Sequence, residues 1–407
     1  MAIKSPLSTN RNIAIIGGGP AGLRAAEVAV SGGAEVTVYD AMRSVGRKFL
    51  VAGKSGLNLT NGEDFEPLLN RYSGTNLPTD LWQKILSDFD TEALRKWAAD
   101  LGVETFVASS GKVFPVPLNG TIKAAPLLRR WVERLREQGV SFQVGHQWVG
   151  LEADRQLIFQ HGSDTVTRRH DAVILALGGA SWPQTGSTGT WVSILEEASV
   201  SMTPLTSSNC GWEVEWPAPL LEEAEGLPMK NLKLSAGGAS RRGELVITRY
   251  GLEGGPIYHL GPVLRSMSSP EVVIDFKPDL TVEELILRMG EVRRNFVREA
   301  RRRWKLDPAV GALLKYLPDR GPWKSVDQLA REVKHCRVAL TRPRPVEEAI
   351  SSAGGVSWSE LDDQLMIKKL PGIYVAGEMI DWDAPTGGYL LQACFATGTH
   401  VGKAALK

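Results

Sequence analysis

The chain has 407 residues, which is long enough for two or three domains with substantial apolar cores. Lys and Arg total 47 against 46 for Asp and Glu, so the formal net charge is only +1, and 43% of the residues are hydrophobic. This balance argues against a general polyanion-binding protein and against an acidic disordered chain. The 42 glycines indicate that the backbone approaches something closely at several places.

The cysteines and histidines give no sign of a disulfide framework or a metal site. Cys210, Cys336 and Cys394 are widely spaced, and no two form a C-x-x-C pair, so a reducing cytoplasm is expected. The six histidines show no H-x-x-x-H spacing, and no metal is predicted. Residues 1–12 lack the apolar core of a secretory signal, and no run approaches ~18 apolar residues, so neither export nor a membrane span is expected.

The first predicted elements form a β-turn-α-β unit. Residues 12–16 are a short apolar run rich in β-branched side chains, residues 17–22 are a glycine-rich turn, and helical periodicity follows to residue 30. A second strand is predicted at 35–39. This order is typical of the opening of a doubly wound parallel sheet.

Further along the chain the predicted elements alternate between helix and strand. Helical periodicity covers about 63–100, a hairpin is expected at 104–107 and 112–116, and a helix from about 121 to 138. The apolar run 171–177 is predicted to be a buried strand that returns to the first sheet.

The second half of the chain opens with a β-rich region. Short strands are predicted at 211–215, 231–234, 244–248 and 272–276. A long helix is expected from Thr281 to Trp304, and more helical sequence extends to about 334. A strand at 372–377 and a final helix from 387 to about 405 end the chain.

The glycine-rich turn carries a dinucleotide-binding fingerprint. Gly17, Gly19 and Gly22 satisfy G-x-G-x-x-G between a strand and a helix. Asp40 ends the next strand, eighteen residues after Gly22, where an acid can accept hydrogen bonds from ribose hydroxyls. The first glycine permits the tight turn, and the second lets the pyrophosphate approach the backbone closely. The third glycine lets the helix pack closely against the strand. Pro20 and Ala21, inside the turn, are also assigned to the nucleotide site.

The choice between NAD and FAD depends on the far end of the chain. A strand ends in Gly377 and Glu378, and Gly387-Gly388-Tyr389-Leu390 opens the last helix. In two-part FAD enzymes such an arrangement sets an acid beside the ribitol chain and aims a helix N-terminus at the flavin pyrimidine edge. There the dipole stabilises negative charge on the reduced ring, so these residues are predicted to bind FAD.

The sequence resembles the aminoacetone oxidase-like flavoproteins, also called BaiN-like or YhiN-like, over nearly its whole length. The resemblance rests on motifs at residues 17–22, 46–50, 57–61, 178–189, 243–256, 353–356, 377–381 and 387–392. It implies an α/β fold in which an FAD-binding Rossmann-like doubly wound domain carries an inserted β-barrel-like domain and a helical segment. The corresponding boundaries are 1–200 with 345–407 for the FAD domain, 201–278 for the β-rich insert, and 279–344 for the helical segment.

The resemblance also implies further FAD-binding residues. Arg47 and Lys48 follow the second strand and are expected to meet the pyrophosphate, with solvated loop charges as the alternative. Gly178 and Gly179 follow the returning strand, and Val149 lies on the strand where such folds hold adenine through backbone groups.

In one place the chain departs from the family: Ser55-Gly56-Leu57-Asn58 stands where relatives usually carry Gly-Arg-Cys-Asn, which points to a subgroup with a different substrate.

The leading hypothesis is an FAD-dependent oxidoreductase that exchanges a hydride between flavin N5 and a small organic substrate, an amine or a conjugated enone. Only one G-x-G-x-x-G is present, so no separate NAD(P)H domain is expected, and O₂ or transiently bound NAD(P)H is the other redox partner. No catalytic acid or base is identified. The alternative is a flavoprotein that binds RNA through the basic 281–305 helix, although the net charge of +1 favours a solvated helix face.

Overall fold

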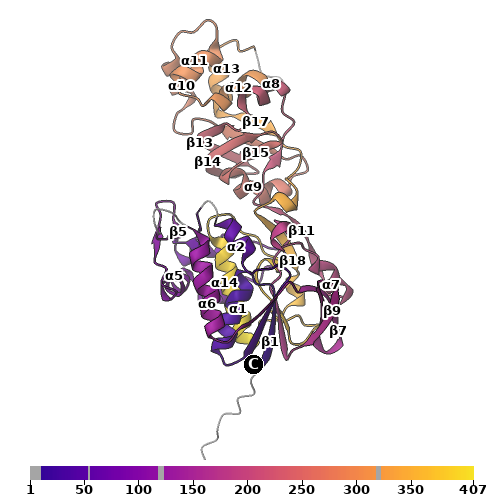
Figure 1. The fold of residues 1–407 in the computed structure, drawn as a ribbon. Helices are drawn as coiled ribbons and strands as arrows, with labels where there is room; N and C mark the ends of the chain where they lie inside the picture. The colour runs from indigo at the N-terminus through magenta and orange to yellow at the C-terminus, as the bar shows by residue number, and fades with distance from the viewer. Residues whose placement is uncertain (1–10, 54–55, 118–122, 318–321) are drawn as a thin grey trace, which may run out of the picture. The chain divides into compact units, whose positions relative to one another are not determined.

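The computed structural model describes residues 11–53, 56–117, 123–317 and 322–407. Two compact units divide the chain: unit 1 combines the residues up to Thr206 with those from Ser351 onward, and unit 2 runs from Ser207 to Ile350. Unit 1 therefore contains both the indigo and the yellow end of the colour scale in Figure 1. Within the described residues, none of the helices combines the length and the apolar character that crossing a membrane requires.

A five-stranded parallel sheet forms the centre of unit 1. Its strands, in spatial order, are β19 (Ile373–Val375), β10 (Ala172–Leu175), β1 (Asn12–Ile16), β2 (Glu35–Asp40) and β6 (Ser141–Val144). All neighbouring pairs are parallel. The side chains of β10 and β19 are buried throughout, which explains why these strands read as uninterrupted apolar runs. The predicted doubly wound sheet, including the return at 171–177, is confirmed.

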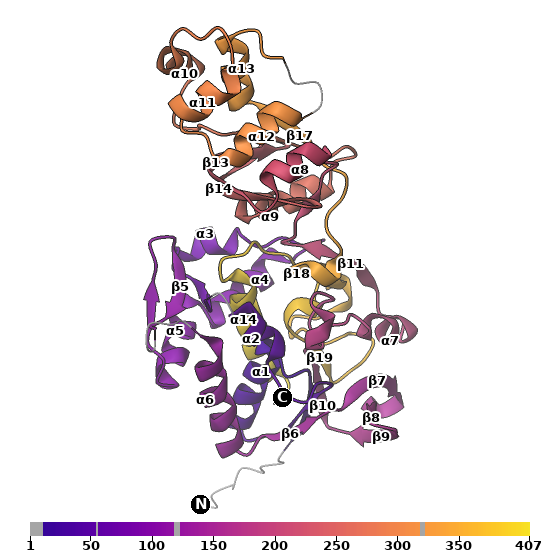
Figure 2. The same cartoon turned by 45° about the horizontal axis from the view of Figure 1, so that its top comes forward.

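Two helices from opposite ends of the chain lie side by side on this sheet (Figures 1 and 2). They are α1 (Pro20–Ser31) and α14 (Tyr389–Ala404). Glycines on α14 permit the close approach, because a Cβ at Gly398 would lie 2.4 Å from the carbonyl oxygen of Ala21, and one at Gly402 would lie 2.8 Å from Cβ of Val28. The final helix therefore packs backbone to backbone against the helix that opens the nucleotide-binding turn.

The other elements of unit 1 surround the sheet. The helices are α2 (Arg47–Ala52), α3 (Phe65–Leu69), α4 (Thr79–Asp88), α5 (Thr91–Asp100), α6 (Ala124–Glu137) and α7 (Trp191–Glu197). The outer strands are β3 (Thr60–Asn61), β4 (Thr105–Val107), β5 (Lys112–Pro115), β7 (Gln147–Glu152), β8 (Gln156–His161), β9 (Asp164–Arg169), β11 (Met202–Ser208) and β18 (Ser351–Val356). The expected hairpin is present as β4 and β5.

Buried tryptophans fill the space between the helices of unit 1. The rings of Trp97 and Trp131 meet edge to face with centroids 4.7 Å apart, and Trp131 stacks on Phe395 at 5.2 Å. These residues come from α5, α6 and α14, so the aromatic contacts join helices that are far apart in the sequence. Much of the tryptophan content of the chain therefore belongs to the core and not to the site.

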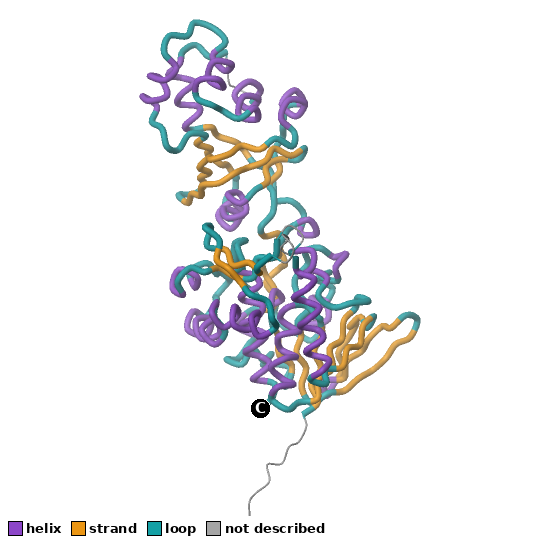
Figure 3. Tube along the Cα trace, turned by 60° about the vertical axis from the view of Figure 1, so that its left-hand side comes forward, coloured by secondary structure: helices purple, strands orange, loops and turns teal. Residues whose placement is uncertain are grey.

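Unit 2 is built on one six-stranded sheet, drawn in orange in Figure 3. Its order is β12 (Trp212–Glu213), β15 (Gly251–Glu253), β14 (Ala239–Thr248), β13 (Pro228–Ala236), β16 (Glu271–Asp275) and β17 (Cys336–Ala339). The chain after β17 returns to β12, where the backbone N–H of Glu213 donates to the carbonyl oxygen of Arg342 at 2.8 Å and the backbone N–H of Thr341 donates to the carbonyl oxygen of Glu213 at 2.9 Å. These hydrogen bonds close the sheet, in agreement with the predicted β-barrel-like insert.

Among the described residues of unit 2, six helices accompany this sheet. They are α8 (Ala218–Ala224), α9 (Gly255–Arg265), α10 (Val282–Met289), α11 (Phe296–Arg303), α12 (Pro308–Tyr316) and α13 (Val326–Lys334). The predicted continuous helix over 281–305 is wrong, because the chain leaves the helical path between α10 and α11. Gly290 has a φ of 61° and Asn295 a φ of 58°, and both values end regular helix.

Candidate functional site

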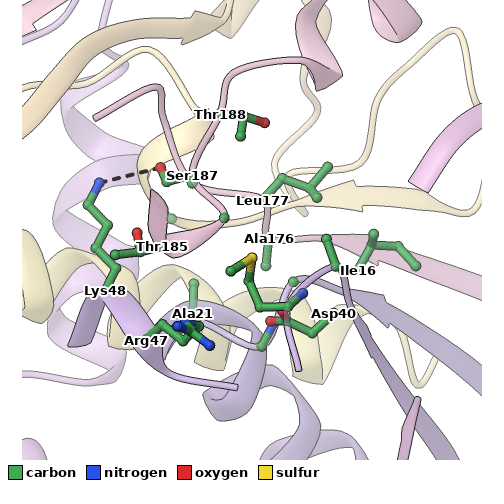
Figure 4. A pocket seen from close by; sticks show the side chains of 18 of the residues that line it. Ile16, Ala21, Asp40, Arg47, Lys48, Ala176, Leu177, Thr185, Ser187 and Thr188 are labelled. Carbon is green, nitrogen blue, oxygen red and sulfur yellow. Dashed lines mark hydrogen bonds between the residues drawn. The ribbon is translucent and has the colours of Figure 1, made fainter. Parts of the chain in front are cut away.

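A cavity lies within unit 1 at the carboxyl ends of three strands of the parallel sheet, where ligands bind in open α/β folds. Residues that directly follow β1, β10 and β19 contribute to its wall, among them Gly17, Ala176 and Ala376. Figure 4 shows side chains of α2, of the last residue of β2 and of the 185–188 segment around this cavity. The sequence-predicted residues that line it are Gly17, Gly19, Pro20, Ala21, Asp40, Arg47, Lys48, Gly178, Gly377 and Glu378.

The three fingerprint glycines have different surroundings. Gly17 has a φ of 105°, and a Cβ there would lie 2.3 Å from the carbonyl oxygen of Ala176. A Cβ at Gly22 would lie 2.0 Å from the carbonyl oxygen of Gly17, so both positions exclude a side chain for reasons of packing. A Cβ at Gly19, in contrast, would meet nothing within 4 Å. The backbone at Gly19 therefore borders open space, which is the arrangement that a closely bound pyrophosphate requires.

The helix that starts at this turn presents free donors to the cavity. Gly19 is the N-cap of α1, no side chain caps the helix, and no acidic residue stands in its first turn. Pro20 occupies the first position, where its missing N–H costs no hydrogen bond. The remaining unpaired N–H groups and the positive end of the helix dipole favour a bound anion such as the phosphates of a dinucleotide.

Asp40 binds backbone groups at the edge of the same cavity. Its Oδ2 accepts a hydrogen bond from Gly18 N at 2.9 Å and its Oδ1 accepts one from Met42 N at 2.8 Å. Burial raises the pKa of the Asp40 carboxyl, and the two N–H groups and the charge of Arg47 oppose that rise in pKa. The side chain thus fixes two loops, and each oxygen retains a lone pair for a ribose hydroxyl.

Arg47 and Lys48 are neighbours on α2 with different partners. Lys48 Nζ lies 2.7 Å from Glu378 Oε2 and donates to Ser181 Oγ at 2.7 Å. The other carboxylate oxygen of Glu378 accepts a hydrogen bond from Ser352 N at 2.9 Å. Within the described part of the chain, Arg47 forms no ion pair. Lys48 therefore holds Glu378 in place, whereas the charge of Arg47 remains available for an anion in the cavity.

Some predicted residues lie outside the cavity wall. Val149 is 43% exposed, and the wall next to it is formed by Gln147 and Trp148 of the same strand. Gly179 stands behind the wall, because a Cβ there would lie 1.7 Å from Ser352 Oγ. Gly22 packs against the carbonyl oxygen of Gly17 and does not line the cavity. The substituted motif at 55–58 is only partly visible, since Lys54 and Ser55 lie outside the described residues.

The residues from Gly387 to Leu390 form a second cluster, at the start of α14. A Cβ at Gly388 would lie 2.4 Å from the carbonyl carbon of Thr60, and Asn61 Nδ2 donates to Gly387 O at 3.3 Å. The hydroxyl of Tyr72 donates to the carbonyl of Tyr389 at 2.8 Å. No side chain caps the helix at Gly388, so its N-terminal dipole remains uncompensated in a fixed orientation.

Several residues of the cavity wall are not predicted from the sequence to belong to the site. They include Met42, His146, Thr185, Ser187, Thr188, Trp191 and Cys394. Ser187 and Thr188 belong to the 178–189 motif, which was a usable signal, but nothing in the sequence marks Met42 or Cys394. Burial raises the pKa of the Cys394 thiol to about 12, so it stays protonated and is no nucleophile at neutral pH. In the described parts of the chain, no three His, Cys, Asp or Glu residues are placed to hold a metal ion.

A parallel sheet, a glycine-rich turn with an open second glycine, and an acid at the end of the second strand together define a dinucleotide-binding enzyme fold. The family described as HI0933-like protein Rossmann domain matches residues 11–404, and the chain belongs to this family. The predicted family, the α/β fold class and the class of FAD-dependent oxidoreductases are thereby confirmed.

Two curated relatives cover almost the whole chain. The 3-dehydro-bile acid delta(4,6)-reductase of Clostridium scindens is 25% identical, over 97% of this chain and 98% of its own. The ribosomal RNA dihydrouridine synthase of Escherichia coli K12 is 24% identical, over 93% of this chain and 94% of its own.

Solved structures agree in fold. The open conformation of a flavocytochrome c3 fumarate reductase superposes with a TM-score of 0.56 at 14% identity, covering 98% of this chain and 78% of that one. The 3-ketosteroid delta1-dehydrogenase of Sterolibacterium denitrificans, solved with 1,4-androstadiene-3,17-dione, gives a TM-score of 0.52 at 11% identity and covers 98% of this chain and 100% of that one. At these identities the likeness concerns the fold alone.

Replacing Gly19 tests the assignment of the turn. We expect Gly19→Val to weaken FAD binding at least about tenfold, because the new side chain occupies the space next to the phosphates. The denaturation midpoint of the FAD-free protein should stay unchanged, since a Cβ at this position touches nothing and the φ of −80° suits valine. Flavin fluorescence titration measures the affinity. Gly255→Val, at another glycine with open space around it, is the matched control, and equal FAD affinity in both variants would contradict the assignment.

A double-mutant cycle tests the role of Lys48. Lys48→Met and Glu378→Gln should each destabilise the FAD-free protein, and together they should cost less than the sum, with a coupling of about 1 kcal/mol. The reason is that each single change leaves the other charge in a partly buried place. Urea unfolding of the four proteins gives the coupling. Additive effects would mean that Lys48 does not hold Glu378 in solution.

Proposed function

We propose that the protein is an FAD-dependent reductase that transfers a hydride from flavin N5 to the carbon–carbon double bond of a conjugated enone, with a reduced nicotinamide as electron donor. The observation that carries this proposal is the cavity in unit 1, in which Gly19, Asp40, Arg47 and Glu378 line one continuous wall. Each of these residues suits a different part of one extended dinucleotide. Oxidation of an amine by O₂ is the other reaction that the same site chemistry allows.

The residues that would hold FAD follow from their surroundings. The pyrophosphate would lie against the open backbone at Gly19, the uncapped start of α1 and Arg47, which forms no ion pair with any described residue. Asp40 would accept the ribose hydroxyls, and Glu378 would lie along the ribitol chain. When bound, FAD supplies a carrier that accepts and releases a hydride, which none of the protein's own side chains can do.

The protein's own contribution is positioning and electrostatics. Lys48 and Ser352 hold the two oxygens of the Glu378 carboxylate, and Ser181 in turn accepts a hydrogen bond from Lys48, so the carboxylate is fixed before a ligand arrives. The start of α14 is held by Thr60 and Asn61, which keeps the positive end of its dipole in one orientation. Such a fixed dipole favours negative charge where a reduced flavin carries it.

The names of the two relatives favour reduction over amine oxidation. One is named as a delta(4,6)-reductase of a 3-dehydro-bile acid, and the other as a dihydrouridine synthase. Both names denote saturation of a carbon–carbon double bond, although the two substrates differ greatly in size. A double bond conjugated to a carbonyl is the feature that these substrates share, and we take it as the substrate class here.

Anaerobic half-reactions test this function. We expect the purified protein to bind FAD, and NADH or NADPH to bleach the flavin absorbance under anaerobic conditions. A 4-ene-3-ketosteroid should then restore the absorbance faster than air or an imine does. Fast reoxidation by air together with bleaching by an amine would show an oxidase instead. A protein that takes up no FAD on reconstitution would remove both alternatives.

Binding of RNA is a second candidate function, favoured by one specific observation. Arg302 and Arg303 on α11 pair with Glu299, but Arg293, Arg294 and Arg301 form no ion pair among the residues that the structure describes. Two relatives are named as ribosomal RNA dihydrouridine synthases, which places the same chemistry on an RNA base.

Filter retention of ribosomal RNA tests this candidate. Binding should be strongest at about 50 mM salt and should fall steeply as salt rises, because phosphate contacts release counterions. Neutralising Arg293, Arg294 and Arg301 to glutamine should reduce retention at least about tenfold. Arg331→Gln, which removes a charge paired with Asp327 on α13, is the matched control. No retention at low salt would exclude this candidate and leave the reductase proposal intact.

A further inference from the structure

A second cavity lies wholly within unit 2, and none of its lining residues is assigned to the dinucleotide. Its wall comes from β13, from β14, from the chain after β16 and from α10. The lining residues are Asn231, Leu232, Arg242, Gly243, Lys277, Pro278, Asp279, Leu280 and Arg288. Three of them are cations and one is a carboxylate, so the lining carries a net positive charge.

Lys277 is the fixed element of this cavity. It is half-buried, and its Nζ donates to the carbonyl oxygen of Lys305 at 2.9 Å. Its own carbonyl oxygen accepts a hydrogen bond from Lys334 Nζ at 2.8 Å, and Lys334 in turn pairs with Asp275 at 2.7 Å. Both the backbone and the ammonium group of Lys277 are thus held in place, and two of its three N–H donors remain for a ligand.

The protein balances the charges in the cavity only in part. Arg242 pairs with Asp279 at 2.7 Å, which accounts for the carboxylate of the lining. Lys277 and Arg288 form no ion pair within the described residues. Burial lowers the pKa of Lys277, and the nearby charges of Arg288 and Lys305 lower this pKa further, against the opposing effect of Asp307. A bound anion would relieve both the desolvation and the repulsion of these cations.

We propose that this cavity binds the phosphate group of a small phosphorylated molecule. A phosphate offers several acceptor oxygens and close to two negative charges, which match the ammonium of Lys277 and the guanidinium groups of Arg242 and Arg288 in the lining. A carboxylate has only two oxygens and one charge. The site shares no residue with the cavity of unit 1, so it does not depend on the proposed reductase function.

Calorimetric titration of the full chain, saturated with FAD, tests the proposal. Inorganic phosphate and adenosine 5′-monophosphate should both bind and should compete with each other, whereas adenosine should not bind. Tighter binding of the monophosphate than of inorganic phosphate would show that the cavity takes a phosphate attached to a larger molecule. Tighter binding of inorganic phosphate would show that it takes the free ion. In Lys277→Met and in Arg288→Gln, affinity for both ligands should fall at least about tenfold, because each change removes one cation from the cavity.

Two controls make the result specific. Arg302→Gln removes a charge that is paired with Glu299 on α11, and it should leave phosphate affinity unchanged. Arg331→Gln, which removes a charge paired with Asp327 on α13, should also leave it unchanged. The proposal is overturned if neither phosphate nor the monophosphate binds. It is also overturned if an oligoribonucleotide binds more tightly than the monophosphate and Arg302→Gln weakens that binding as much as Lys277→Met does.

Discussion

The parallel pairing of β10 with β19 is the contact on which the site depends. Val173, Ile174 and Leu175 pair with Ile373, Tyr374 and Val375, two hundred residues further along the chain. Because parallel strands end at the same edge of a sheet, this pairing brings the last part of the chain to the cavity that the first part opens. It also directs α14 onto α1, where Gly398 and Gly402 permit contact between backbones. Loss of this pairing would remove Glu378 and the start of α14 together, while the glycine-rich turn itself would remain.

Glycine serves two opposite purposes in this unit. At Gly17, Gly22 and Gly398 a side chain is excluded because other backbone atoms already occupy its place. At Gly19, in contrast, a Cβ would meet nothing within 4 Å, so the backbone borders open space. The first kind permits close packing of the backbone, and the second leaves room beside the turn. Counting glycines cannot separate the two kinds, whereas the surroundings of each Cβ position do.

The sequence was sufficient for local features and insufficient for distant ones. Gly17, Gly19, Gly22 and Asp40 were predictable because one short β-turn-α-β unit fixes their spacing. The contact of Lys48 with Glu378 joins residues 330 positions apart, and no local pattern encodes it. Val149 belongs to β7, which contributes Gln147 and Trp148 to the cavity wall, but the register of β7 shifts between Trp148 and Gly150, which changes the residues that face the cavity. The arginine-rich stretch was predicted as one helix because helical propensity is high on both sides of Gly290 and Asn295, whose left-handed backbone the periodicity does not reveal.

The way in which unit 2 interrupts the chain has a consequence for how such proteins diverge. β11, which leads into unit 2, and β18, which leads out of it, are neighbours in a two-stranded sheet. Just inside the insertion, Ile350 N donates to Asn209 O at 3.2 Å, so the entering and leaving segments are joined at the boundary. An inserted module whose two ends are adjacent can be lengthened, shortened or exchanged without changing the strand order of the host sheet. Relatives can therefore differ throughout the insertion and still keep the parallel sheet and the cavity at its carboxyl ends.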